Sequence, residues 1–113
     1  MKRAPKTQAE RIWVEYLAHR GHEVEEQDGF LLSRNNTRRR FFWLLYSSAR
    51  ARRTFRKAEL SGIRKLLSRC ERKRGKAYVV VCFTWPEPKF VAASAEYVLK
   101  EKELHADKGG VFL

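Results

Sequence analysis

Residues suited to disulfide frameworks and metal sites are scarce in this sequence. Its 113 residues include two cysteines and three histidines, and the spacing of these residues matches no zinc site. We therefore interpret Cys70 and Cys82 as reduced core residues of a cytoplasmic protein. No apolar stretch approaches the length that a membrane-spanning helix needs, and the basic start, MKRAPKTQ, is followed by no apolar region. Neither a membrane protein nor a secreted protein is predicted.

Acidic residues are also few, and one long stretch has none. The formal net charge is +12, from 25 lysines and arginines against 13 aspartates and glutamates. Between Gly29 and Ala58 the chain carries eight arginines, one lysine and no acid. A field of this sign attracts polyanions and speeds association with them. Because the charge is so unevenly placed, we favour a binding surface over a generally basic, solvated exterior.

Apolar runs in the sequence predict a β-sheet. Phe41 to Ser48 (FFWLLYSS) is short and aromatic, which is typical of a buried strand. Ala77 to Phe83 (AYVVVCF) is typical of a strand that is buried on both faces. Further strands are predicted at Phe30 to Arg34 and Lys89 to Ala93, and at most a short edge strand at His22 to Gln27.

Three helices are predicted around these strands. The first begins at Thr7, which forms a capping box with Glu10, and it ends at Gly21. The second lies within residues 54–74, where apolar residues recur at helical spacing. The third begins after the N-cap Ser94 and runs to about Leu104.

The order of these elements predicts the fold class. We expect an α/β protein with one domain over residues 7–113 and a basic tail at residues 1–6. Its mixed β-sheet is flanked by helices in the order α-β-β-β-α-β-β-α. The helix between the strands at 41–48 and 77–83 acts as a right-handed crossover, so these two strands are expected to be parallel.

This pattern resembles the PD-(D/E)XK nuclease superfamily, with its restriction-endonuclease-like fold, and most of all the archaeal Holliday junction resolvases. The resemblance covers roughly Ala9 to Ala93. AERIWVEYLAHRGHEV resembles the opening helix of that family, FFWLLYSSAR the strand that normally ends in Glu-x-Lys, and KFVAAS the last strand. The catalytic domain of the tRNA-splicing endonuclease, which has a similar fold, is a related alternative. The resemblance favours DNA over RNA as the partner and permits a homodimer.

The catalytic motif of that family is degenerate in this chain. In such nucleases two carboxylates hold Mg²⁺ and a lysine helps to position the attacking water. The resemblance places the acid at Leu44 and the lysine at Tyr46, and neither side chain can perform that chemistry. Glu10 matches the family's helix glutamate, although the capping box also explains it, and Asp28 is more simply a turn residue before Gly29. We therefore predict no catalytic residue, metal or cofactor, with Mg²⁺ needed only if Glu10 and Asp28 form an active nuclease.

The basic residues are the predicted binding site. The connection from Ala49 to Lys57 (ARARRTFRK) follows the strand end that bears the active site in active relatives, and arginine offers paired donors that match phosphate. Basic residues on the second helix are explained equally well as a solvated surface. The predicted nucleic-acid-binding residues are Arg38, Arg39, Arg40, Arg50, Arg52, Arg53, Arg56 and Lys57.

Three functions follow as hypotheses. The favoured one is a nucleic-acid-binding protein of nuclease-like fold that contacts phosphates through the arginine-rich loop and does not cleave. The first alternative is a metal-dependent, structure-selective DNA endonuclease of the resolvase kind. The second is a protein-interaction module that binds an acidic partner.

Overall fold

The computed structural model describes residues 8–27, 29–85 and 88–106 of the chain. The helices are α1 (Gln8–His19), α2 (Lys57–Arg72) and α3 (Ala95–Glu101). The strands are β1 (Glu23–Gln27), β2 (Phe30–Arg34), β3 (Arg40–Ser48), β4 (Arg52–Thr54), β5 (Lys76–Phe83), β6 (Lys89–Ser94) and β7 (Glu103–His105).

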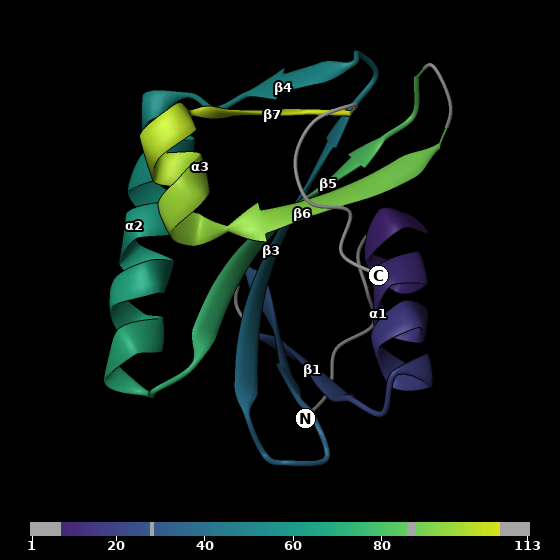
Figure 1. Cartoon of the computed structure of the whole chain (residues 1–113), viewed down its shortest axis with the longest axis vertical. Helices are drawn as coiled ribbons and strands as arrows, with labels where there is room; N and C mark the ends of the chain where they lie inside the picture. The colour runs from purple at the N-terminus through teal and green to yellow at the C-terminus, as the bar shows by residue number, and fades with distance from the viewer. Residues whose placement is uncertain (1–7, 28, 86–87, 107–113) are drawn as a thin grey trace.

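Five of the strands form one mixed sheet in the order β1-β2-β3-β5-β6 (Figure 1). Strands β3 and β5 are parallel, with a register that runs from the pair Phe41 and Lys76 to the pair Ser48 and Phe83. All other neighbours in this sheet are antiparallel. The predicted α/β class, a mixed sheet flanked by helices, is therefore confirmed, as is the parallel crossover through α2.

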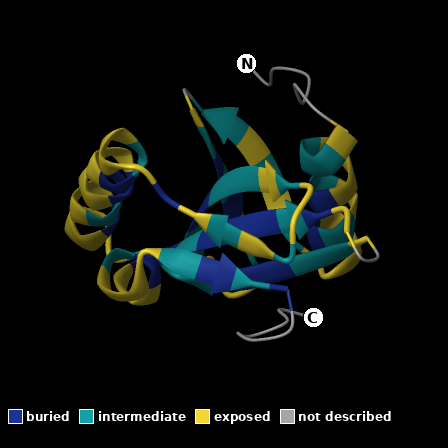
Figure 2. Ribbon diagram, turned by 90° about the horizontal axis from the view of Figure 1, so that it is seen from above, coloured by how far each residue is buried: buried dark blue, intermediate teal, exposed yellow. Residues whose placement is uncertain are grey.

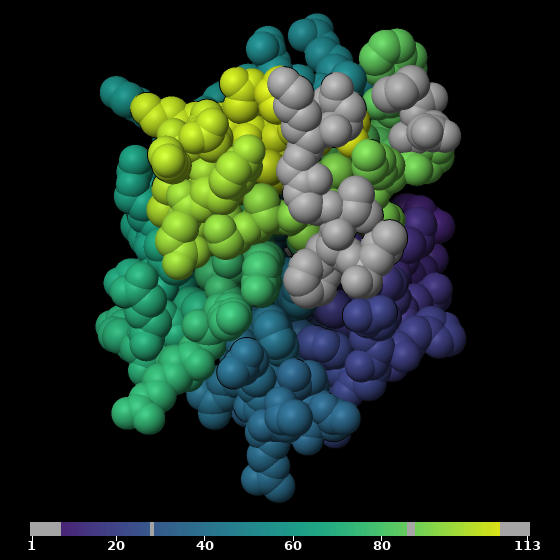
Figure 3. Space-filling view, in the orientation of Figure 1, coloured from purple at the N-terminus to yellow at the C-terminus, as the bar shows by residue number. Residues whose placement is uncertain are grey.

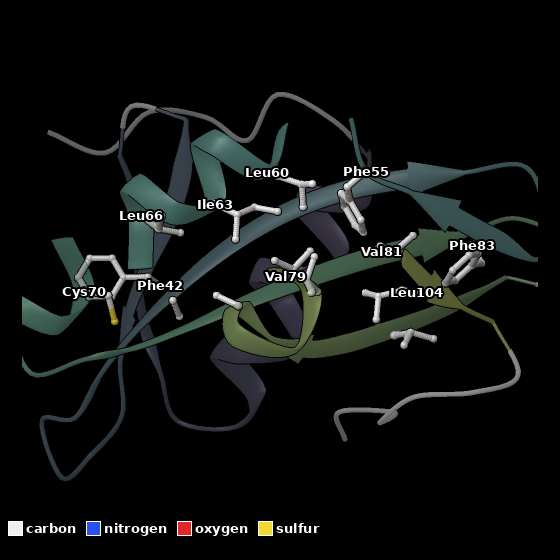
Figure 4. Packing of buried hydrophobic residues seen from close by; sticks show 14 of the residues in the cluster. Phe42, Phe55, Leu60, Ile63, Leu66, Cys70, Val79, Val81, Phe83 and Leu104 are labelled. Carbon is white, nitrogen blue, oxygen red and sulfur yellow. The ribbon is translucent and has the colours of Figure 1, made fainter. Parts of the chain in front are cut away.

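Strand β3 is apolar on both faces because both faces are covered. Phe42, Leu44 and Tyr46 point to the face that α2 and α3 cover, where they join the larger core cluster (Figure 4). Trp43 and its neighbours in the alternation point to the opposite face, which α1 covers with Trp13. Figure 1 shows α2 and α3 together on one side of the sheet and α1 on the other.

The face beneath α1 is closed by aromatic packing. The rings of Trp13 and Trp43 meet edge to face, with 5.4 Å between their centroids, and Leu17 and Leu31 are buried beside them. Ser33 lies buried under this cluster, where its hydroxyl accepts a hydrogen bond of 2.8 Å from the indole nitrogen of Trp43. The buried polar group is therefore satisfied, as an apolar environment requires.

A two-stranded ribbon, β4 with β7, is an addition that the sequence did not predict. The third helix was expected to reach Leu104, but it ends at Glu101 because Lys102 adopts a left-handed conformation with φ of 64°. Residues 103–105 then extend and pair antiparallel with residues 52–54, which were expected to form an irregular connection. Ser94 caps α3 as predicted, because its hydroxyl accepts from the amide of Tyr97 at 3.2 Å.

Several sequence predictions fall outside the described residues: the basic tail, the capping box of Thr7, and Asp28. Cys70 is buried, Cys82 is half-buried, and neither forms a disulfide. Burial raises the pKa of the Cys70 thiol to about 11, so it stays protonated at neutral pH. In the described part of the chain, no helix is long and apolar enough to cross a membrane.

Candidate nucleic-acid interface

The predicted binding residues lie at the two ends of β3. This strand is nine residues long, which separates its ends by about 26 Å. The hairpin cluster, which we define as Arg38, Arg39 and Arg40, lies where the chain enters β3. The residues from Arg50 to Lys57 lie where the chain leaves it. In Figure 3 these two segments project from opposite ends of the molecule, so the structure does not bring the two clusters together.

The connection after β3 is fixed in place by Ser48. Its hydroxyl oxygen accepts from the amide of Arg50 at 3.1 Å and is within 3.2 Å of the carbonyl oxygens of both Arg50 and Arg52. Its carbonyl oxygen accepts from the amide of Thr84 at 2.9 Å, which ties this end to the segment after β5. The pairing of β4 with β7 holds the next residues. The arginine-rich segment is therefore an ordered part of the fold.

Arg53 differs from its neighbours because its guanidinium has a partner inside the protein. It binds the Glu59 carboxylate in a bidentate manner, with N–O distances of 2.7 and 3.3 Å, and both side chains are only about one-fifth exposed. It also lies 5.2 Å from the ring centroid of Tyr46 and 5.1 Å from that of Phe55. Arg53 therefore joins β4 to α2 and β3, which is a structural role.

Glu59 supplies part of the neutralisation that we had expected from an external anion. Besides Arg53, it accepts a hydrogen bond of 2.9 Å from the amide of Arg56 at the start of α2. The hydrogen bond from Arg53 is the main reason that the pKa of Glu59 lies below its ordinary value. Glu103 similarly lies 3.8 Å from Arg52. The loop is thus partly balanced by two acids from later in the chain.

Four cations remain at the surface of this segment. The side chain of Arg56 is 86% exposed, and that of Arg52 remains mostly exposed beside Glu103. We define the loop cluster as these exposed residues: Arg50, Arg52, Arg56 and Lys57.

The hairpin cluster is displayed by a turn that Asn35 organises. Its side-chain oxygen accepts from the amide of Thr37 at 3.1 Å and from the amide of Arg39 at 2.9 Å. Arg38 adopts φ of 63°, a left-handed conformation that is uncommon for a residue with a side chain. Arg38 and Arg39 are exposed, while Arg40 is half-buried at the start of β3.

A groove of about 550 Å³ lies between α2 and the face of the sheet at β2 and β3. Its floor is formed by Phe30, Leu44 and Tyr46, which are half-buried. One stripe of α2 forms its wall, with small residues near the start of the helix and exposed basic residues towards the end. The stripe consists of Ala58, Gly62, Lys65, Arg69 and Arg72.

The groove runs between the two arginine clusters. At one end of the groove α2 begins at Lys57, the last residue of the loop cluster, and beyond the other end of α2 Gly75 approaches β3. A side-chain carbon on Gly75 would lie 2.7 Å from the ring of Phe42 and 3.1 Å from the carbonyl oxygen of Arg40, so only glycine allows this approach. In Figure 2 the side of α2 turned away from the sheet is largely exposed.

The basic residues of the groove were not part of the predicted site. The signal that could have found them is the interval of three or four residues from Ala58 to Arg72, which places small and basic residues on one stripe of a helix. Sequence reasoning also missed Trp85, which is exposed and follows Thr84, the residue whose amide binds the carbonyl oxygen of Ser48.

The face beneath α1 holds the predicted catalytic candidate Glu10. This residue lines a small cavity of about 160 Å³ together with Glu26, which the sequence did not single out. The residues of β3 at this cavity are Trp43 and Leu45, whereas Leu44 and Tyr46 lie on the opposite face of the sheet. The predicted motif positions and the helix glutamate therefore do not converge.

The residues at this cavity fit a divalent metal only in part. Glu10 and Glu26 offer the oxygen atoms that Mg²⁺ prefers, but the β3 side chains there have no ligand atom suited to it. Among the described residues, no group of three or more histidine, cysteine, aspartate or glutamate side chains could hold a metal ion.

Comparison with solved structures supports the expected fold. The chain is similar to the structure of Archaeoglobus fulgidus Hjc, described as a Holliday junction resolvase from an archaeal hyperthermophile, with a TM-score of 0.60 and 14% sequence identity. The match covers 77% of this chain and 70% of that one. No protein-family model matches the sequence, and no curated protein matches it. The chain therefore has a nuclease-like α/β fold of the kind seen in a Holliday junction resolvase.

Proposed function

We propose that this protein binds nucleic acid, DNA in preference to RNA, through phosphate contacts made by the loop cluster, and that it does not cleave its ligand. The observation that carries this proposal is the loop cluster itself. Four exposed cations lie on an ordered segment at one end of β3, and the nearby acids Glu59 and Glu103 balance only part of the local charge.

The nature of these side chains favours phosphate as the ligand. Arginine presents a planar set of donors that fits a phosphate, and most of the affinity of such contacts depends on salt. The net charge of +12 would steer a polyanion towards the protein from any direction. The similarity to Hjc adds to the expectation of DNA, since that protein is described as a Holliday junction resolvase.

The lack of cleavage is inferred from the face beneath α1. Phosphodiester cleavage of the metal-dependent kind needs acidic ligands and a cation around the water. Glu10 and Glu26 are the acids at that cavity, and the β3 side chains beside them are Trp43 and Leu45. A strand position that would supply a further acid or an ammonium group is thus filled by an apolar residue.

Replacement of Arg50, Arg56 and Lys57 by alanine tests the proposal. We expect the affinity for duplex DNA to fall about tenfold, to a similar extent for unrelated sequences, and the slope of log K against log salt to flatten by up to about 3. Fluorescence anisotropy of a labelled duplex measures both quantities. Trp85 provides a second signal, because Trp13 and Trp43 are buried and the fluorescence of Trp85 should change on binding nearby.

The matched control removes three exposed cations elsewhere: Arg11, Arg20 and Lys100, from α1, its C-terminal end and α3. This variant carries the same net charge as the loop variant. Equal losses in both variants would show that binding follows net charge and not the loop cluster. A wild-type protein that binds neither DNA nor RNA at low salt would instead favour a module for an acidic protein partner.

A metal-dependent endonuclease remains the second candidate, because Glu10 and Glu26 line one cavity. Its test is cleavage of a four-way junction in Mg²⁺ or Mn²⁺ by the wild type and by the Glu10→Ala and Glu26→Ala variants. We expect no cleavage by any of them and unchanged binding. Cleavage by the wild type that either substitution abolishes would replace the proposal of a binding protein.

A further inference from the structure

The groove between α2 and the sheet combines two kinds of surface. Its floor carries the aromatic rings of Phe30 and Tyr46, and its wall carries three exposed cations, Lys65, Arg69 and Arg72. The guanidinium of Arg69 lies 5.8 Å from the ring centroid of Phe30, so charge and aromatic surface are adjacent. An aromatic floor beside a positive wall is complementary to a nucleotide, which has a flat base and an anionic phosphate.

The charge of the groove remains positive although an acid lines it. Glu59 is the one acid among the described residues at the groove. Its carboxylate is bound by Arg53 at 2.7 Å and lies 3.9 Å from Arg56, so it is neutralised within the protein. A phosphate that enters would therefore meet the basic wall without a free carboxylate opposite.

The floor also offers a hydrogen-bonding group. The pKa of Tyr46 is raised, chiefly because the residue is buried and also because Glu59 is close, so its hydroxyl stays protonated at neutral pH. It can thus donate as well as accept, as the polar edge of a base requires.

The dimensions of the groove favour an unpaired strand over a duplex. The volume of about 550 Å³ lies between a helix and the sheet, with the aromatic rings on its floor. In a duplex the bases are stacked within the helix, so their faces cannot reach such a floor, whereas an unpaired base exposes its face. Helix α2 is about 24 Å long, and Gly75, three residues after its end, lies beside the carbonyl oxygen of Arg40, so a strand along the groove would run from the loop cluster towards the start of β3.

We propose that this groove binds an unpaired segment of nucleic acid, with bases on Phe30 and Tyr46 and phosphates along Lys65, Arg69 and Arg72. This inference rests on the proposed function and deepens it. The loop cluster gives general affinity for phosphates, and the groove gives a preference for ligands that contain an unpaired strand, such as gaps, flaps or junctions with open arms.

Gly62→Leu tests the groove without disturbing the fold. Among the described residues, a Cβ at Gly62 would meet no atom within 4 Å apart from its chain neighbours and the backbone of its own helix, and Gly62 lines the groove, so a leucine side chain there would extend into it. The thermal midpoint should rise, because glycine is a poor helix former. Base stacking on an aromatic side chain makes a large contribution, so we expect the affinity for a single-stranded oligonucleotide to fall about tenfold or more. The affinity for a blunt duplex should not change.

Gly62→Ala is the matched control, since it improves helix propensity by a similar amount but adds only one carbon. It should retain wild-type affinity for both ligands. A second pair compares Lys65→Ala/Arg69→Ala, in the groove, with Arg64→Ala/Lys73→Ala, which remove the same charge from residues of α2 and its end that do not line it. Only the first double variant should lower the ratio of single-strand to duplex affinity.

The outcomes separate this inference from the proposed function. If Gly62→Leu binds the single strand as tightly as the wild type, the groove is not the site, while the loop cluster can still bind duplex. If an acidic peptide binds the wild type and Gly62→Leu abolishes that binding alone, the groove serves a protein partner and the inference is overturned. If the wild type binds no nucleic acid at low salt, the proposed function itself fails.

Discussion

The two faces of the central sheet differ in how completely they are covered. Beneath α1, the indole of Trp43 is fully buried against Trp13, and the cavity beside Glu10 is small. Beneath α2, the floor residues Leu44 and Tyr46 are half-buried beside a groove more than three times as large. We call the face beneath α1 the closed face; the open face, beneath α2 and α3, combines the larger core cluster with a groove that has room for a ligand.

The two faces also differ in the charge of the residues that line their cavities. Glu10 and Glu26 line the cavity on the closed face, whereas Lys65, Arg69 and Arg72 line the open one. The alternative of an active nuclease places catalysis beside Glu10, but the basic groove lies on the other side of the sheet. The basic groove and the acids Glu10 and Glu26 are therefore on opposite faces of the sheet.

The largest expected effect on stability comes from disrupting the core on the closed face. Trp43→Ala removes a fully buried indole that also donates to Ser33, and we expect a loss of about 3–5 kcal/mol of unfolding free energy. Leu44→Ala, the adjacent residue on the open face, should cost only about 1 kcal/mol because its side chain is half-exposed. Urea denaturation measures both. Equal costs would contradict the difference in packing.

A smaller loss of stability is expected when the side chain of Arg53 is removed. Arg53→Ala removes a bidentate pair with Glu59 and the contacts with Tyr46 and Phe55, so we expect a loss of about 2 kcal/mol. Arg52→Ala is the matched control, since this exposed neighbour should change stability by less than about 0.5 kcal/mol. If thermal unfolding shows the same midpoint for both variants, Arg53 is not a structural residue.

Low pH should lower the stability of the protein through Glu59, which lies on the open face. Its pKa is lower in the folded protein than in the unfolded chain, so its contribution is complete at neutral pH and is lost as the pH falls through and below the ordinary range of a glutamate. Glu59→Gln should therefore be less stable than the wild type at pH 7, and the gap should narrow at pH 3. Circular dichroism melts at the two pH values provide the measurement. A gap that is constant with pH would exclude ionisation of Glu59 as its source.

The smallest expected effect concerns the end of α2 at the lower end of the groove. Arg74 adopts φ of 55°, a left-handed conformation that costs a residue with a side chain about 1 kcal/mol. Glycine avoids that cost but has more freedom to lose on folding, so Arg74→Gly should stabilise by about 0.5 kcal/mol or less. Differential scanning calorimetry can detect the small rise. A clear fall would mean that the Arg74 side chain makes stabilising contacts.

The main sheet could be predicted because its central strands are recognisable from their own residues, without knowledge of their partners. The runs at 41–46 and 77–83 are mostly aliphatic and aromatic, and α2 between them has a clear stripe with Ile63 and Leu66 in the core. The β4–β7 ribbon could not be found in this way. Its strands have three residues each, carry charged side chains, and pair across about fifty positions of the chain, so no local pattern marks them.

The site was harder to predict because β3 is apolar on both faces. Alternation then leaves open which residues face α1, and the motif positions Leu44 and Tyr46 were assigned without that knowledge. The same difficulty applies to Arg53. Its partner Glu59 is six residues away on a different element, so nothing in the sequence distinguishes it from the exposed Arg52.

The hydrogen bonds of Ser48 affect the rate of the proposed binding. Because its hydroxyl and carbonyl fix the segment after β3 before any ligand arrives, the loop cluster does not have to fold around its target. Little conformational entropy is then lost on association, and no slow ordering step precedes it. For the proposed binding to a polyanion, the rate of association should then be governed by diffusion and long-range charge.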